Sequence, residues 1–343
     1  MRGRGPVSLL VAFLFVTVSS AMLAQAADRP IDPEPEFTLG EAVDNPTDDR
    51  PPTVPMRVAL SSDDSQLLVL RADGSVETWD VAARTKAGTR DSNELFAYAP
   101  GDGTLVTRSA DGAATASSAS GGATSLFPTT SAHAALSGDG DVLAVVGQFG
   151  RVDVWSLGDT ATSTTLKTAL PARNGLAVSR DGALIAAAEG TYSDDAGHTT
   201  VVEVWRRGAD SPLLRIDEKD AGVLVGVWGV LFSPDGSLLA ADTQKDGRSG
   251  IRVWELPDGR VHFSSDGFNS YWVRALAFSA DGRHLASGDE KGTIWVRGLD
   301  GGGTRHIGRP GVVQSLAFSH DGRYLVVGNW DSTVEFWRVG SDG

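Results

Sequence analysis

The chain has 343 residues, of which 41 % are hydrophobic, so it can form one large domain or two or three small ones with real cores. The formal charge of −14 argues against a protein that holds nucleic acid or an anionic membrane by its overall field. The absence of cysteine excludes disulfides, cysteine metal sites and thiol catalysis, while 41 glycines favour many short strands joined by tight turns.

Residues 1–26 have the pattern of a cleaved signal peptide. Arg2 and Arg4 precede an apolar run over residues 7–18, and Ala24-Gln25-Ala26 has the small-x-small form that signal peptidase accepts. The run is shorter than the roughly 20 apolar residues that a transmembrane helix needs. We therefore expect cleavage after Ala26 and an extracytoplasmic protein, periplasmic or secreted, with no membrane insertion after cleavage.

Residues 27–53 form an arm rich in proline and acidic residues. Seven of the 15 prolines lie between Pro30 and Pro55, and acidic residues separate them. Most of this stretch can form neither a helix nor a central strand, because proline has no backbone N–H to donate. We interpret it as an extended arm with one short strand near residues 36–40.

From residue 54 to residue 343 the chain repeats one pattern, in which a small apolar residue and Ser precede an Asp-Gly turn and an apolar pair. Seven copies are present, namely ALSSDDSQLL from Ala59, AYAPGDGTLV from Ala97, ALSGDGDVLA from Ala135, AVSRDGALIA from Ala177, LFSPDGSLLA from Leu231, AFSADGRHLA from Ala277 and AFSHDGRYLV from Ala317. Equivalent positions lie 38, 38, 42, 54, 46 and 40 residues apart, a period that suits four short strands with their turns.

The last copy shows how each repeat is expected to fold. Residues 316–319 form an apolar strand, Asp321-Gly322 accepts the positive φ of a tight hairpin, and residues 324–327 return antiparallel. A second turn leads to residues 333–337, which alternate in polarity as a strand with two different faces does. Similar third strands containing a large apolar or aromatic residue recur in most copies.

These repeats, which read LAFSxDGRxLxxG followed by a VxxW strand, resemble the WD-repeat β-propeller family over about residues 54–339. The resemblance implies an all-β, seven-bladed β-propeller of four-stranded antiparallel blades around a central channel. The seventh repeat has no fourth strand of its own after Trp337, and an unpaired strand edge invites aggregation. We therefore expect Phe37–Gly40 to pair with Val334–Val339 and to close the ring.

The repeats depart from the buried His-Ser-Asp-Trp tetrad that the resemblance implies. In the last repeat Asp331 and Trp337 fit, but Arg309 and Val327 stand where His and Ser belong. Because no repeat has a complete tetrad, we expect stability to rest more on apolar packing between blades than on buried polar networks. The third strand of the second repeat, residues 113–117, has no large side chain and should pack loosely.

No pattern for catalysis, a metal or a cofactor is found. The six histidines occupy unlike repeat positions without HxH or HExxH spacing, namely His133, His198, His262, His284, His306 and His320. GxSxG is absent, and the serines before each Asp-Gly pair have a turn-capping use. The aspartates at residues 139–141 and 194–195 lack the spacing of an EF-hand loop. We predict no catalytic residue, no metal and no cofactor.

Tryptophans outside the third-strand position are the candidate partner-binding residues, since aromatic side chains are common interface anchors. The family resemblance places the loops before a first strand and between second and third strands on one face. The predicted site comprises Tyr271, Trp272, Arg274, Trp330, Trp228, Arg309 and Gln314. The alternative is that these aromatic rings pack between neighbouring blades, whereas Trp295 is expected in the core.

We predict a non-catalytic exported propeller that serves as a scaffold for a protein or peptide, without binding nucleic acid. This prediction rests on the lack of catalytic patterns and on the surplus tryptophans, because a fold alone does not fix a function. Two alternatives remain open. One is a propeller hydrolase or lactonase that uses the central channel, and the other is a periplasmic Tol-type propeller in an envelope complex, whose repeats share the turn seen at Ser233–Gly236.

Overall fold

The structure is a computed structural model. It describes residues 29–30, 34–42, 54–90, 95–101, 103–108, 113–117, 123–128, 134–146, 151–157, 162–168, 175–193, 197–218, 229–245, 248–269, 272–309 and 311–339. The predicted signal peptide and its cleavage site lie outside these ranges. Over the described ranges no helix has the length and apolar character needed to cross a bilayer.

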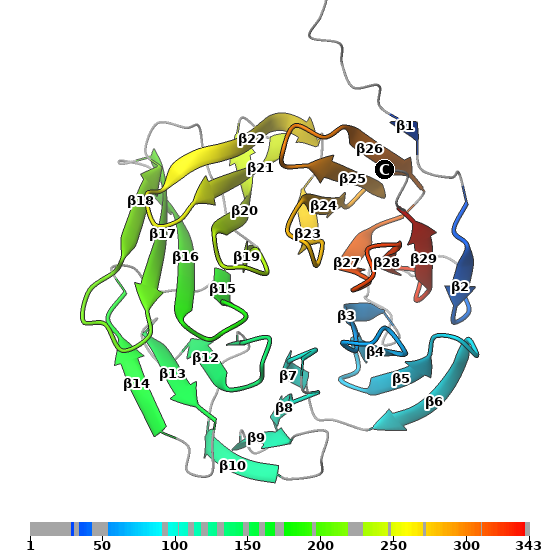
Figure 1. Cartoon of the computed structure of the whole chain (residues 1–343), viewed down its shortest axis with the longest axis horizontal. Helices are drawn as coiled ribbons and strands as arrows, with labels where there is room; N and C mark the ends of the chain where they lie inside the picture. The colour runs from blue at the N-terminus through cyan, green and yellow to red at the C-terminus, as the bar shows by residue number, and fades with distance from the viewer. Residues whose placement is uncertain are drawn as a thin grey trace, which may run out of the picture.

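Seven sheets stand in a ring around a central opening, and apart from two strands of the N-terminal arm the strands of each sheet run outward from that opening in chain order (Figure 1). Blade 1 holds β3 (Pro55–Leu60), β4 (Gln66–Arg71), β5 (Val76–Asp80) and β6 (Thr85–Arg90). Blade 2 holds β7 (Leu95–Tyr98), β8 (Leu105–Arg108), β9 (Ala113–Ser117) and β10 (Ala123–Pro128). Blade 3 holds β11 (Ala134–Leu136), β12 (Val142–Val146), β13 (Val152–Ser156) and β14 (Thr162–Leu166).

The other blades follow the same order. Blade 4 holds β15 (Gly175–Val178), β16 (Leu184–Ser193), β17 (Gly197–Arg206) and β18 (Leu214–Glu218). Blade 5 holds β19 (Val230–Phe232), β20 (Leu238–Lys245), β21 (Arg248–Glu255) and β22 (Arg260–Asn269). Blade 6 holds β23 (Val273–Phe278), β24 (His284–Asp289), β25 (Thr293–Gly298) and β26 (Thr304–Gly308), and blade 7 holds β27 (Val313–Phe318), β28 (Tyr324–Asn329) and β29 (Val334–Arg338). The predicted seven-bladed all-β ring is confirmed.

The repeated Ser-x-Asp-Gly turn builds the inner hairpin of the blades through one set of hydrogen bonds. In blade 7 the hydroxyl of Ser319 donates to Asp321 Oδ1 at 2.6 Å and accepts from the backbone N–H of Tyr324 at 2.9 Å. Gly322 follows with a φ of 69°, which suits glycine because it has no Cβ. The same serine and aspartate contacts recur at Ser179 and Ser233, so the motif is structural.

The N-terminal arm supplies the missing fourth strand of blade 7, as predicted. The short strand β2 (Phe37–Leu39) pairs antiparallel with β29, with Phe37 opposite Phe336 and Leu39 opposite Val334 (Figure 1). The Phe37 ring stacks on Phe336 with ring centroids 4.3 Å apart, and Leu39 is buried. The edge of β29 is therefore covered, and the ring closes without a covalent link between blades 7 and 1.

A second arm strand was not expected from the sequence. The two-residue strand β1 (Arg29–Pro30) lies parallel to the outer edge of blade 6, with Arg29 opposite Arg305 and Pro30 opposite His306. Blade 6 thus has five strands where four were predicted. An edge position tolerates proline because the missing N–H faces away from the sheet.

The core lies between neighbouring blades. Separate clusters of buried apolar side chains join blades 2 and 3, 3 and 4, 4 and 5, 5 and 6, 6 and 7, and 7 and 1. The third-strand tryptophans Trp205, Trp254 and Trp337 are buried in these clusters, as the repeat predicts. Among the described residues no such cluster joins blades 1 and 2.

Buried ion pairs replace the expected tetrad in two blades, which the sequence did not predict. In blade 7 Arg309 Nε lies 3.0 Å from Glu335 Oε2, and the indole N–H of Trp337 donates to the same carboxylate at 2.9 Å. In blade 1 Arg71 and Trp79 donate to Glu77 Oε2 at 2.6 and 3.0 Å. Polar networks therefore add to the apolar packing there.

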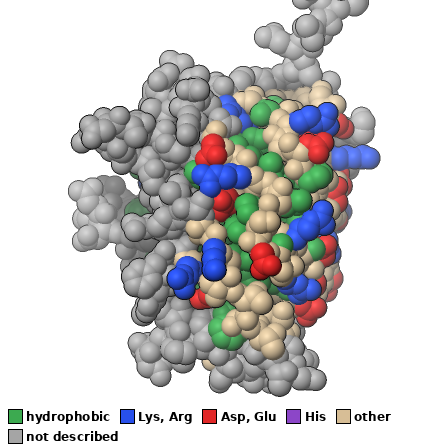
Figure 2. Space-filling model, turned by 90° about the vertical axis from the view of Figure 1, so that its left-hand side faces the viewer, with side chains coloured by type: hydrophobic (Ala, Val, Ile, Leu, Met, Phe, Trp, Pro, Cys, Tyr) green, Lys and Arg blue, Asp and Glu red, His purple; other side chains and the backbone are tan. Residues whose placement is uncertain are grey.

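Among the described residues, the outer wall of the ring has no large patch of one charge sign on the side that Figure 2 shows. Lys and Arg side chains lie beside Asp and Glu side chains, with hydrophobic side chains between them. This mixed surface differs from the lining of the central opening, where the charged side chains of the described residues are all positive.

Candidate functional site

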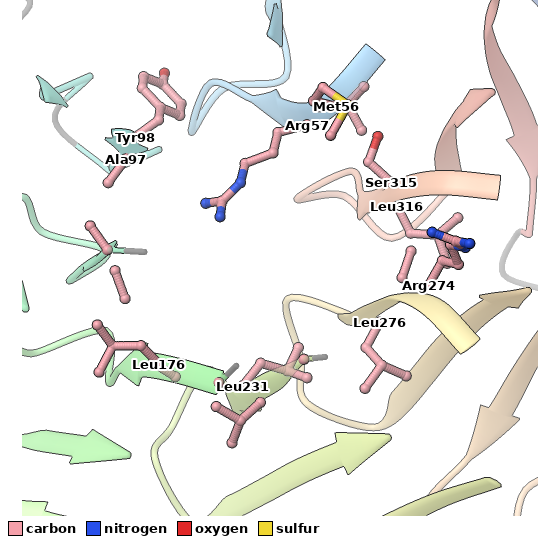
Figure 3. Close-up of a pocket in the computed structure, with 18 of the residues that line it drawn as sticks. Met56, Arg57, Ala97, Tyr98, Leu176, Leu231, Arg274, Leu276, Ser315 and Leu316 are labelled. Atoms are coloured by element: carbon pink, nitrogen blue, oxygen red, sulfur yellow. The ribbon is translucent and has the colours of Figure 1, made fainter. Parts of the chain in front are cut away.

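The central opening is a channel of about 910 Å³, lined by residues from the seven innermost strands and from the segments just before them (Figure 3). Its volume falls in the range of roughly 300–1,000 Å³ that is typical of small-molecule sites. The channel is therefore large enough to hold a ligand or an inserted peptide segment.

The wall contributed by blades 3, 4 and 5 is apolar. Glycine, alanine, valine, leucine and phenylalanine make up this wall, and no charged or hydrogen-bonding side chain lies among the described lining residues of these blades. The residues are Ala134, Ala135, Leu136, Gly175, Leu176, Ala177, Val178, Gly229, Val230, Leu231 and Phe232. Burial of an apolar ligand surface against this wall would be favourable, because both surfaces would be removed from water.

The wall contributed by blades 6, 7 and 1 carries both charged side chains and most of the polar ones, while Tyr98 of blade 2 adds a phenol. Trp272 and Arg274 come from blade 6, Gln314 and Ser315 from blade 7, and Arg57 from blade 1. The two charges among the described lining residues are both positive, although the whole chain has a formal charge of −14. The channel therefore has one polar, cationic wall opposite an apolar one.

Arg57 extends from β3 into the middle of the opening (Figure 3). A β-bulge between Pro55 and Arg57 shifts the register of β3 against β4, and such bulges redirect side chains next to functional sites. The side chain is exposed to the channel, but atoms of the ring surround it. The resulting desolvation lowers the pKa of Arg57, although an arginine stays charged near neutral pH.

Nothing in the described part of the chain forms a hydrogen bond or an ion pair with the Arg57 guanidinium. In blades 4 to 7 the positions equivalent to Arg57, on the inner strand or just before it, are occupied by Gly175, Gly229, Ala275 and Ser315, which also line the channel. These side chains are short, so the guanidinium has free space in front of it. No sequence pattern singles out Arg57, because its significance depends on strands that are far apart in the chain.

Three of the predicted site residues line the channel. Trp272 lies before β23 and is 45 % exposed, while Arg274 Nη2 lies 3.5 Å from Glu290 Oε2 in a partly exposed pair. Gln314 occupies the bulge of β27 in the same way as Arg274 occupies the bulge of β23. The structure thus brings these three side chains to one sector of the ring.

The other predicted residues do not all belong to this sector. Trp330 lies in the turn between β28 and β29, and its backbone N–H donates to the carbonyl of Val312 at 3.0 Å, which places this turn beside the start of β27. Arg309 is buried, with its charge neutralised by Glu335, so it does not fit the predicted partner-binding role. Tyr271 and Trp228 lie outside the described residues, so their role stays a prediction.

Carboxylates of the described residues serve the turns and the blade networks rather than the channel. In the hairpin turns, hydrogen bonds from Ser61 and Ser65 lower the pKa of Asp63 to about 2, and the Ser179 hydroxyl lowers the pKa of Asp181. Over the described ranges no group of three His, Cys, Asp or Glu side chains is arranged to hold a metal ion. The described channel wall offers two guanidinium groups, an indole, an amide, a serine hydroxyl and a phenol, which are groups suited to binding.

Comparison with known proteins places these features in context. The family model for the WD domain, G-beta repeat, matches residues 257–296 and 304–338. A solved chain of hydrazine synthase from Kuenenia stuttgartiensis has a TM-score of 0.68 at 16 % identity, covering 88 % of this chain and 100 % of that one. The β-propeller domain of Cps50 (Swd1) from Myceliophteria thermophila has a TM-score of 0.68 at 14 % identity, covering 90 % and 99 %. At these identities the likeness to solved structures shows the fold alone.

Proposed function

The chain is a WD-repeat β-propeller, and we propose that it is an exported, non-catalytic scaffold that binds a protein or peptide. The binding surface in this proposal is the face that holds the start of β23 and the turn between β28 and β29. WD-repeat propellers are typically protein-interaction scaffolds, which supports the class of function but leaves the partner open.

The exposure of Trp272 is the observation that carries the proposal. Within the described residues the exposed large hydrophobic side chains are Trp272 at 45 % and Val261 at 54 %. Tryptophan is among the side chains most enriched where binding energy concentrates, because it buries a large area and also donates a hydrogen bond. Trp272 lies at the channel wall beside Arg274 and Gln314, so an incoming partner would meet polar groups next to the indole.

The two loops of the proposed face share one side of the ring. The backbone N–H of Glu290 donates to the carbonyl of Trp272 at 3.2 Å, which joins the start of β23 to the turn between β24 and β25. The corresponding bond in blade 7 joins Trp330 to Val312. In each of these blades, therefore, the start of the first strand lies beside the turn that follows the second strand.

The exported location in this proposal rests on the signal-peptide pattern of residues 1–26. The positive charges of Arg2 and Arg4, the short apolar run and the Ala24-Gln25-Ala26 site together support secretion and cleavage. Detection of a mature protein that begins at Ala27 in the exported fraction is the expected outcome, and N-terminal sequencing of the purified protein measures it.

The proposal is tested by affinity capture from the exported fraction with wild-type protein, Trp272→Ala and Val261→Ala. We expect Trp272→Ala to lose the captured partner, because an exposed anchor side chain is removed, while thermal melting stays unchanged. Val261→Ala removes an exposed apolar side chain from β22 on another blade and serves as the matched control. Equal capture by all three proteins would show that the face is wrongly assigned.

A further inference from the structure

We propose that the central channel binds a small organic carboxylate with an apolar body, and that Arg57 is the residue that recognises the carboxylate. This inference goes beyond the scaffold function, because it assigns a ligand site inside the ring. It rests on the position of one guanidinium, on the space around it and on the division of the channel into a polar wall and an apolar wall.

The Arg57 guanidinium extends from the bulge of β3 into the middle of the opening (Figure 3), and it forms no hydrogen bond or ion pair with the described residues. Other arginines of the same sector are neutralised, since Arg71 pairs with Glu77 at 2.6 Å and Arg309 pairs with Glu335 at 3.0 Å. An arginine that the described part of the ring leaves unneutralised in a partly desolvated channel is suited to an anion from outside the ring.

The space in front of this guanidinium is kept open by blades 4 to 7. Their equivalent positions Gly175, Gly229, Ala275 and Ser315 have short side chains or none, so the channel is wide on that side at the level of Arg57. A Cβ added at Gly229 would meet no atom closer than Asp242 Oδ1 at 3.9 Å, so packing within the blade does not require this glycine. The short side chains therefore leave room for a ligand beside the guanidinium.

The charged group of the ligand follows from the donors that the channel offers. A carboxylate carries one negative charge and can accept two parallel hydrogen bonds from a guanidinium, so a single arginine satisfies it. A phosphate dianion would need further donors to replace its lost hydration, and the described channel wall offers one other cation, Arg274, whose charge is shared with Glu290. The geometry therefore favours a carboxylate over a phosphate.

The body of the ligand follows from the opposite wall. Leu176, Leu231 and Phe232 belong to the apolar wall, which comes from blades on the other side of the ring from Arg57 (Figure 3). An apolar group attached to the carboxylate can reach this wall, because the channel of about 910 Å³ accommodates a drug-sized molecule. Contact with both walls gives a site for an amphiphilic acid.

The proposal is tested by fluorescence titration with 1-pyrenebutyrate, a carboxylate on an apolar ring system, and with the matched neutral alcohol 1-pyrenebutanol. We expect saturable binding of one 1-pyrenebutyrate per chain, weakened about 10- to 100-fold by Arg57→Ala because a charge-assisted hydrogen bond is lost. Arg57→Lys should show a smaller loss, since it keeps the charge but not the planar pair of donors. Inorganic phosphate at equal concentration should not displace the probe.

The control variant is Arg206→Ala, which removes an exposed arginine at the end of β17 and changes the net charge equally. It should bind 1-pyrenebutyrate as the wild type does, and all variants should melt like the wild type. Equal binding by Arg57→Ala and wild type, equal affinity for 1-pyrenebutanol and 1-pyrenebutyrate, or the lack of saturable binding would each overturn the proposal. Because the titration needs no protein partner, its result is independent of the capture experiment.

Discussion

The interface between blades 7 and 1 and the interface between blades 1 and 2 differ in how they are held. Between blades 7 and 1 a buried cluster includes Leu39, Val58 and Phe336, and Arg71 Nη1 donates across the interface to the Ser332 carbonyl at 2.8 Å. Between blades 1 and 2 no apolar cluster is found among the described residues, and β6 is exposed along its whole length.

The two interfaces also differ in chain connectivity. Blades 1 and 2 are consecutive in the chain, so a short peptide keeps them together at a small entropic cost. Blades 7 and 1 lie at opposite ends of the repeat array and have no direct covalent link, so non-covalent contacts alone hold them. At the interface where the chain does not close the circle itself, the ring adds the extra strand β2 and a hydrogen bond from Arg71 to an apolar cluster like those between most consecutive blades.

A departure in the first repeat fits this explanation. Asp64 stands where other repeats have glycine, and it adopts a φ of 57°, which is unfavourable for a residue with a side chain. Its carboxylate accepts hydrogen bonds from the backbone N–H groups of His320 and Asp321 in blade 7, at 2.9 and 3.1 Å. The aspartate thus combines a less favourable local backbone with a contact across the closing interface.

Among the changes that test this comparison, removal of the closing strand β2 should have the largest effect on stability. Deletion of residues 27–45 exposes β29 and removes Phe37 and Leu39 from the closing interface, so we expect the free energy of unfolding to fall by about 5 kcal/mol or more. The midpoint of denaturation by guanidinium chloride measures this change. Deletion of residues 27–33 removes β1 but keeps β2, and it should change the midpoint far less. An equal effect of the two deletions would contradict closure by β2.

Loss of the buried arginine of blade 7 should have the next largest effect. Arg309→Met leaves Glu335 as an uncompensated buried charge and should cost about 3 kcal/mol. The double variant Arg309→Met with Glu335→Gln should recover most of this loss, because the glutamine side chain carries no charge and its amide oxygen can still accept the hydrogen bond from Trp337.

The matched pair for this prediction lies far from the closing interface. In blade 5 Arg260 pairs with Glu255, but the two side chains are 72 % and 34 % exposed. Arg260→Met should therefore cost about 1 kcal/mol or less in the same denaturant measurement. Equal losses of stability in the two arginine variants would show that burial of the ion pair in blade 7 does not increase its contribution to stability.

Larger side chains in the core should distinguish a loosely packed blade from a tightly packed one, with a smaller effect on stability. Ala286 in β24 is fully buried between blades 6 and 7, so Ala286→Val should cost about 1–2 kcal/mol by overpacking. Ala116 in β9 of blade 2 is buried against blade 3, but its own strand has only small side chains, so Ala116→Val should cost less than Ala286→Val. Equal losses in urea denaturation would show that blade 2 is packed as tightly as blade 6.

The smallest expected effect on stability comes from the Ser-x-Asp-Gly turns, which recur around the ring. The Ser179 hydroxyl lowers the pKa of Asp181 in the folded protein, so the stabilisation is present above the unfolded pKa of about 4 and is lost as the pH falls through the lowered value. We expect urea midpoints to fall on acidification below about pH 4. Ser179→Ala should reduce this dependence slightly, and an unchanged pH profile would contradict the role of the turn.

Local patterns made most of the fold predictable from the sequence. The Ser-x-Asp-Gly turns determine the inner hairpins through contacts between residues close in the chain, and seven copies give the blade number. The pairing of Phe37–Gly40 with the last strand was also predictable, because an unpaired edge needs a partner and the arm has one apolar segment. By contrast, β1 has two residues and no polarity pattern, so nothing in the sequence indicates its pairing with β26.

The candidate site was less predictable, for a physical reason. Trp272 could be selected because it is out of phase with the repeat, and the structure shows it exposed. Arg309 was selected as a polar residue near the surplus tryptophans, but its burial depends on Glu335, which lies 26 residues further along the chain. The significance of Arg57 depends on short side chains from several other blades, and it becomes visible once the ring is assembled.

Site-specific photocrosslinking tests the proposed binding face most directly. A photoreactive phenylalanine is placed at Trp272, on the channel side of blade 6, or at Val261, on an outer strand of blade 5, and the protein is irradiated in the exported fraction. A discrete crosslinked adduct from position 272 and none from position 261 is the predicted result. Adducts of equal yield from both positions, or from position 261 alone, would contradict binding through the face of blades 6, 7 and 1.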